Sequence, residues 1–189
     1  MIRMTVDGGD LSEIEKSLGN LRRRAPYVMA RAANRTATHV KKVTSEEVRK
    51  KYVIGVRATQ GIMKVYRATG EKPTARVYIH GTHLNLKKFD VRKSTRKGRI
   101  VYQRARVEQN NSPVPLSARP RPFLAKMANG YHGLFVRKTD EPRSEIRGVA
   151  GPSVPQMIGS REVMYHIHES AQEMLQKRIE HEIDYLLSK

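Results

Sequence analysis

The spacing of the apolar residues changes twice along this chain, and these changes constrain the fold more than any other feature of the sequence. Between residues 10 and 50, apolar side chains recur every three or four positions, which is typical of amphipathic helices. From 62 to 138 they alternate with polar residues or form short runs bounded by glycine and proline, as in strands. Between 160 and 187 the helical spacing returns. The pattern predicts an α+β fold, with N-terminal helices, an antiparallel sheet or sandwich core and a long C-terminal amphipathic helix.

The predicted helices have local start signals. Asp10 and Glu13 form a capping-box pattern ahead of the first helix. Pro26 disfavours helix at the preceding residue and suits the first turn of a second helix, which we expect to continue to about residue 50. Ser160 is expected to cap the C-terminal helix.

The middle of the chain contains two predicted hairpins, formed by Ile62–Thr69 with Thr74–Gly81 and by Phe89–Arg92 with Arg99–Val107. Residues 110–122 contain four prolines, which predicts an extended connection without regular structure. After this connection we expect a short turn of helix at Phe123–Met127 and a core strand at Leu134–Val136. At 189 residues, the whole chain fits one domain.

The segment GPSVPQMIG, residues 151–159, contains two glycines and two prolines and is therefore expected to be a loop. Its apolar side chains are ones that an exposed loop would seldom carry. The prolines restrict the backbone, so little entropy is lost when such a segment docks. The hypothesis is a docking loop that forms a subunit interface together with the last helix, through Pro152, Val154, Pro155, Met157 and Ile158. Packing within the same chain is the alternative.

The net charge of +19 is concentrated in the middle of the chain. Residues 51–140 contain 20 Lys and Arg against 4 Asp and Glu, whereas residues 141–189 contain 6 against 8. A field of this kind favours an acidic partner, which could be nucleic acid, an anionic membrane or an acidic protein. No apolar run approaches the roughly 18 residues of a membrane span, so we expect no segment that crosses a membrane. A membrane is also not among the partners that we expect.

The most basic stretch is RKSTRKGR, residues 92–99, which is expected at the tip of the second hairpin. Its candidate contacts to DNA or to an acidic protein are Arg92, Lys93, Arg96, Lys97 and Arg99. No strand is expected to offer the aromatic pair of a stacking platform, and no helix-turn-helix or zinc-finger spacing is evident. Binding to nucleic acid would therefore depend on salt and not on base sequence. A solvated hairpin that protects a sheet edge is the alternative.

Catalytic chemistry has little support in the sequence. The chain has no cysteine and no nucleophile-elbow motif, and only four carboxylates fall within residues 51–140. His166 and His168 are two residues apart on a predicted helix and so point in different directions, while His80 and His83 have no carboxylate nearby in sequence. We therefore expect no catalytic residue, no cofactor and no metal. The first ten residues contain no apolar h-region, so synthesis in the cytoplasm is expected.

Several motifs resemble those of the minor tail protein Z family of lambdoid phages and prophages. They are FLAKMANGYH from Phe123, LFVRK from Leu134 and, most specifically, GPSVPQM from Gly151 ahead of an amphipathic helix. The spacing of Leu84, Leu86 and Phe89 fits the same pattern, as does the helix from Arg24 to Arg35. The resemblance covers most of the chain.

The resemblance implies a structural virion protein of a long-tailed phage, without catalysis or cofactor. It further implies tail completion and head–tail joining at the head-proximal end, in a ring between the tail tube with its terminator and the head connector. Six copies would match the symmetry of the tail, with other tail and neck proteins as partners. The alternative is a non-specific nucleic-acid-binding protein that acts through the basic middle region.

Overall fold

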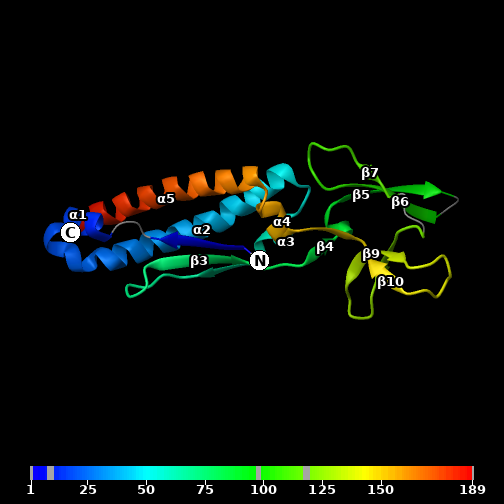
Figure 1. Cartoon of the computed structure of the whole chain (residues 1–189), viewed down its shortest axis with the longest axis horizontal. Helices are drawn as coiled ribbons and strands as arrows, with labels where there is room; N and C mark the ends of the chain where they lie inside the picture. Colours follow the sequence, from blue (N-terminus) through cyan, green and yellow to red (C-terminus); the bar gives the residue numbers. More distant parts are fainter. Residues whose placement is uncertain (1, 8–10, 97–98, 117–119, 189) are drawn as a thin grey trace.

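Two long helices form the central scaffold of the fold. The computed structural model describes residues 2–7, 11–96, 99–116 and 120–188. Helix α2 (Ala25–Lys51) and helix α5 (Arg161–Leu187) lie side by side and run in opposite directions (Figure 1). Each contains 27 residues and is therefore about 40 Å long. The predicted second and last helices are thus confirmed.

The N-terminal helices close one end of this pair. Helix α1 (Leu11–Leu18) stops at Gly19, whose φ of +52° suits glycine, and the 3-10 helix η1 (Gly19–Arg24) leads into α2. Pro26 lies in the first turn of α2, as predicted. A small apolar cluster joins α1 and the start of α2 to the end of α5, with Ile14 and Leu18 packed near Ile183. Asp10, the predicted cap, lies outside the described residues.

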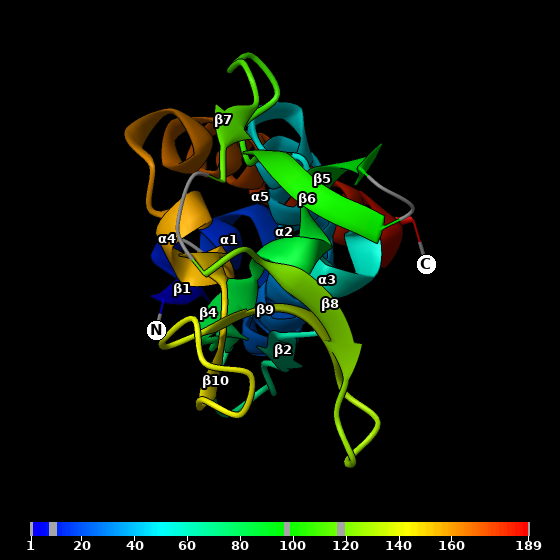
Figure 2. The ribbon, with the colours of Figure 1, turned by 90° about the vertical axis from the view of Figure 1, so that its right-hand side faces the viewer.

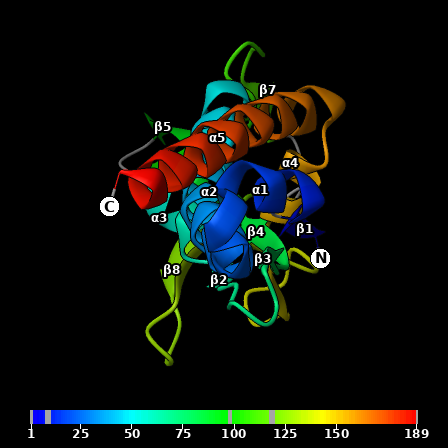
Figure 3. The same cartoon turned by 90° about the vertical axis from the view of Figure 1, so that its left-hand side faces the viewer.

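A three-stranded antiparallel sheet covers the side of α2 that faces away from α5, so this part of the molecule has three layers (Figure 3). Its strand order is β1 (Ile2–Asp7), β3 (Thr74–Ile79) and β2 (Met63–Tyr66). The predicted hairpin is confirmed as β2 and β3, whereas β1 was not predicted. Small residues of α2 permit the close approach of these layers: Ala32, Ala33 and Ala37 are fully buried.

The other end of the molecule is built of small antiparallel sheets (Figures 1 and 2). One contains β5 (Asp90–Arg96), β6 (Arg99–Arg106) and β7 (Val114–Pro115), the second contains β8 (Phe123–Lys126), β9 (His132–Arg137) and β10 (Ile146–Gly148), and the third contains β4 (His83–Asn85) and β11 (Ala150–Ser153). The short helices α3 (Val56–Gln60) and η2 (Leu86–Lys88) lie in connections. The second predicted hairpin and the core strand at 134–136 are confirmed.

Three local predictions were wrong. The connection at 110–122, which was expected to have no regular structure, contains the two-residue strand β7, which pairs antiparallel with β6. The expected turn of helix at Phe123–Met127 is instead strand β8, which pairs antiparallel with β9. The expected loop at 151–159 is instead the end of β11 followed by helix α4 (Val154–Ile158). The Ser153 hydroxyl accepts a hydrogen bond from the Gln156 backbone N–H at 3.3 Å, and the Ser153 N–H donates to Gln156 Oε1 at 2.8 Å. This reciprocal capping box starts the helix.

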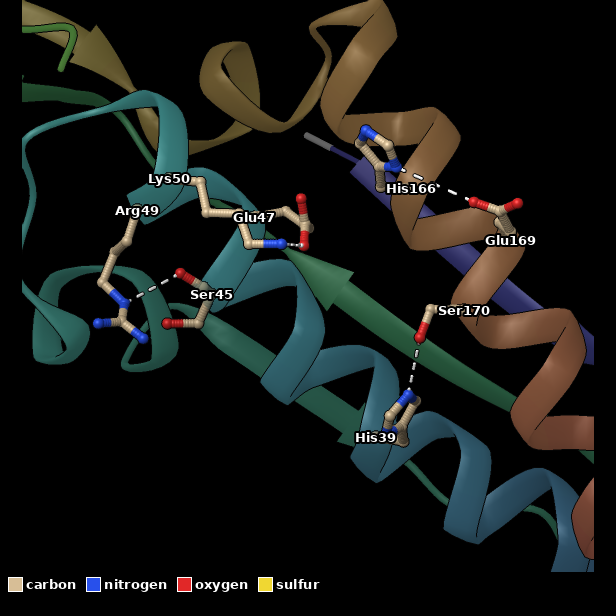
Figure 4. Close-up of polar contacts among 8 residues, drawn as sticks. All are labelled: His39, Ser45, Glu47, Arg49, Lys50, His166, Glu169 and Ser170. Carbon is tan, nitrogen blue, oxygen red and sulfur yellow. Dashed lines mark hydrogen bonds and ion pairs between the residues drawn. The ribbon is translucent and has the colours of Figure 1, made fainter. Parts of the chain in front are cut away.

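Polar contacts hold α5 in place on α2. His39 Nε2 lies 2.9 Å from Ser170 Oγ (Figure 4). Burial is the main factor that lowers the pKa of His39, followed by the charge of Lys42. Further along, Arg31 Nε lies 3.0 Å from Glu182 Oε2, and Glu182 is only 7% exposed. Ser160 occupies the N-cap position of α5 as expected, but its hydroxyl makes no capping hydrogen bond.

Candidate interaction surfaces

The predicted interface segment lies within the core of its own chain. Val154, Met157 and Ile158 are 0% exposed and belong to the main hydrophobic cluster, which also includes residues of α2, the β1–β3–β2 sheet and α5. Pro155 is buried as well, while Pro152 is half-buried and Gln156 is exposed. A neighbouring molecule could therefore contact this segment through Pro152 and Gln156. Contact between subunits at 151–159 stays a prediction.

The predicted basic hairpin is formed by β5 and β6, with Arg96 paired opposite Arg99. Arg92 and Lys93 are exposed on β5. Arg92 Nε lies 3.9 Å from Asp90 Oδ2, and Arg106 Nη2 lies 3.3 Å from the same oxygen. Lys97 lies outside the described residues, as do the side chains of residues 95–101. A contact between this hairpin and DNA or an acidic protein stays a prediction.

The histidines are dispersed. His83 Nδ1 lies 3.1 Å from the carbonyl oxygen of Gly151, which ties β4 to β11. His166 Nδ1 lies 3.9 Å from Glu169 Oε2 on the exposed face of α5 (Figure 4). Among the residues that the structure describes, no three His, Asp or Glu side chains come together in a group that could hold a metal ion.

A basic and aromatic surface that was not predicted lies on the outer face of the β1–β3–β2 sheet. The strand register places Arg3 and Lys64 on either side of Tyr78, and in the next row it places Tyr66 beside Arg76. The rings of Tyr66 and Tyr78 meet edge to face, with centroids 5.1 Å apart. Pairing of β2 with β3 brings these rings together, in an edge-to-face arrangement and not as two parallel faces on which bases could stack.

The chemistry of this sheet face combines cations with an accessible ring. Tyr66 is 54% exposed, and the side chains of Arg3, Lys64 and Arg76 are also exposed. A hydrogen bond from Arg3 is the main factor that lowers the pKa of Tyr78. The sequence contained a signal for this surface, since the tripeptides Lys-Val-Tyr at 64–66 and Arg-Val-Tyr at 76–78 repeat the same alternation on two strands.

Across the described part of the chain, no helix has both the length and the apolar character needed to cross a membrane. Comparison with curated proteins gave no match, and comparison with solved structures gave none either. The family model for the prophage minor tail protein Z matches residues 10–189 and thus includes every motif quoted for the resemblance. The chain therefore belongs to the prophage minor tail protein Z family and is a structural protein of a phage tail.

Proposed function

We propose that this tail protein acts in tail completion at the head-proximal end, as one member of a ring between the tail tube with its terminator and the head connector. The family match over residues 10–189 is the observation that carries the proposal. Six copies would follow the symmetry of the tail. Neighbouring tail and neck proteins are its partners in this proposal, and the virion is its location.

The shape of the molecule is compatible with a ring. Subunits in a cyclic ring make head-to-tail contacts, so each subunit must present two different surfaces that match each other. Here α5 forms one outer side of the three-layered half, and the β1–β3–β2 sheet forms the opposite one (Figure 3). The segment 151–159 holds the start of α5 in position, because its buried side chains lie in the same hydrophobic cluster as Val163 and Ile167.

The direct test is deletion of the gene from the phage, followed by negative-stain imaging of the tails and by addition of the purified protein. Tails of normal length that do not yield infectious particles, and that recover when the protein is added, would agree with tail completion. Normal yields of infectious particles without the gene would contradict it. Shortened or absent tails would also contradict it, since they would indicate a role in tube assembly.

A second candidate function is non-specific binding of nucleic acid. It is favoured by the exposure of Arg92 and Lys93 on the hairpin and by the concentration of positive charge in residues 51–140. Gel-shift assays with duplex DNA would show binding at low salt that weakens steeply as salt rises, because phosphate contacts release counterions. Replacing Arg92 and Lys93 with Glu should abolish this shift. A protein that is inert toward duplex at low salt would exclude this candidate.

A further inference from the structure

The two outer surfaces of the three-layered half have opposite charge. Helix α2 is sandwiched between α5 and the β1–β3–β2 sheet, so the outer face of the sheet and the outer face of α5 point in opposite directions (Figure 3). The inner face of the sheet is filled by Ala75, Val77 and Ile79, which pack toward α2. The alternate residues of the same strands are thereby directed away from the core.

The sheet face is basic. It presents Arg3, Lys64 and Arg76 around the two tyrosines, with Asp7 at the far end of β1. Tyrosine and arginine are enriched in the cores of protein–protein interfaces, where their large side chains contribute much of the binding energy. This composition suits an acidic protein surface.

The outer face of α5 is predominantly acidic, with Lys177 as an exposed cation between Glu173 and Glu180. Five exposed carboxylates recur along the helix at intervals of seven or four residues, which places them in one stripe: Glu162, Glu169, Glu173, Glu180 and Asp184. From first to last they extend about 33 Å. Glu162 also bridges to Lys51 at 3.1 Å, and Glu180 accepts a hydrogen bond from Gln176 at 3.3 Å. We refer to these five residues as the acidic stripe.

We propose that the acidic stripe of one copy binds the basic sheet face of the next copy. This inference rests on the proposed ring and names the two surfaces that would form it. Neighbouring strands lie about 4.8 Å apart, so the three strands β1, β3 and β2 span about 10 Å, and the stripe is long enough to lie across all of them. Because the two surfaces differ and face opposite ways, each subunit can bind one neighbour on each side, as a ring requires.

A second copy fits both surfaces better than nucleic acid does. A polyanion would be attracted to the three cations of the sheet face but repelled by the acidic stripe, whose carboxylates would then have no role. A second copy accounts for both surfaces with one contact. Opposite charge also selects this pairing over sheet against sheet or helix against helix, since like charges facing each other disfavour association.

The first experiment uses the absence of cysteine from the chain. Tyr66→Cys places a thiol on the sheet face, and Gln176→Cys places one beside Glu173 and Glu180 on the stripe. Phage particles made with the double variant should give a ladder of disulfide-linked multimers after mild oxidation, and each single variant should give none. A protein that is present in the particle but stays monomeric after oxidation would overturn the proposed contact.

The second experiment exchanges the charges. Lys64→Glu with Arg76→Glu on the sheet, or Glu173→Lys with Glu180→Lys on α5, should each lower the yield of infectious particles about tenfold or more, because like charges then face each other. A chain carrying all four changes should recover most of the yield. Matched controls are Arg143→Glu and Glu141→Lys, which change exposed charges in the loop between β9 and β10 and should have no effect.

The outcomes distinguish a failure of the proposed contact between sheet and stripe from a failure of the proposed ring. Circular dichroism establishes that each variant is folded before yields are compared. A folded sheet variant that is not rescued by the stripe changes would overturn the pairing while leaving a ring possible. Loss of duplex binding by the sheet variant, with a harmless stripe variant, would identify a polyanion as the occupant instead. Absence of the wild-type protein from the particle would refute the proposed function rather than this contact.

Discussion

Met157 offers a sharp test of whether the segment 151–159 belongs to the core of its own chain. Its side chain in α4 is 0% exposed and is among the largest fully buried side chains of the molecule. Met157→Ala removes buried apolar atoms and leaves a cavity, which costs about 2–5 kcal/mol in similar sites. The free energy of unfolding of a domain is about 5–15 kcal/mol, so the variant should still fold.

The expected change is large enough to measure by thermal unfolding. For a protein of this size, each kcal/mol lowers the Tm by about 2–4 °C, so a loss of about 3 kcal/mol lowers it by about 6–12 °C. Circular dichroism at 222 nm follows the helices, to which α2 and α5 contribute 27 residues each. The control is Gln156→Glu in the same helix. Glu also satisfies the capping box at this position, and the side chain is exposed, so the Tm should change by no more than about 2 °C.

The reasoning would be refuted if Met157→Ala melted within about 2 °C of the unchanged protein, because a filled core site cannot lose three heavy atoms (Cγ, Sδ and Cε) at no cost. A variant with an unchanged Tm that failed to complete tails would instead indicate that Met157 contacts a neighbouring subunit. The two roles of the segment, packing within the chain and contact between chains, are thereby distinguished.

Three further outcomes are expected. Asn85→Ala should lower the free energy of unfolding in urea by about 2–4 kcal/mol, because its amide exchanges two 2.8 Å hydrogen bonds with the backbone of Leu134; an unchanged midpoint would contradict this. Burial lowers the pKa of His39 below 6.5, so the unfolded chain gains the proton first and stability should fall as pH drops from about 7 through the folded-state pKa. His39→Gln should flatten this part of the pH profile in urea titrations, and an equal slope in both proteins would count against it. Gly151→Ala places a Cβ 2.7 Å from the Phe89 ring and should cost about 1–3 kcal/mol in the same assay, whereas an unaltered stability would show that the ring moves freely.

The two long helices and the β2–β3 hairpin could be predicted from the sequence because each depends on a local pattern. Apolar spacing located α2 and α5, and alternation located the β2–β3 hairpin. The resemblance to a phage tail family came from short motifs such as GPSVPQM and was confirmed over residues 10–189. In contrast, β8 is only four residues long, too short for periodicity to separate a strand from a turn of helix.

Elements that depend on distant partners could not be found in this way. Strand β1 pairs with β3 across some seventy residues of chain through backbone hydrogen bonds, which carry no sequence signature of their own. The aromatic and basic face of the sheet also depends on pairing between strands that are far apart in the sequence. Alternation predicts that Lys64 and Tyr66 share one face of a strand, but the register of β1, β2 and β3 brings Arg3, Tyr78 and Arg76 beside them.

Residues 151–159 show most clearly the difference between what the sequence determines and what depends on the tertiary structure. Their apolar character predicts that the segment is buried, since exposed Val, Met and Ile side chains are unfavourable in water. What covers them depends on the space between the start of α5, α2 and the β1–β3–β2 sheet, which exists only once these elements have packed. The spacing of apolar residues can be read from neighbouring positions in the sequence. Burial depends instead on how side chains that are far apart in the chain pack together in the folded core.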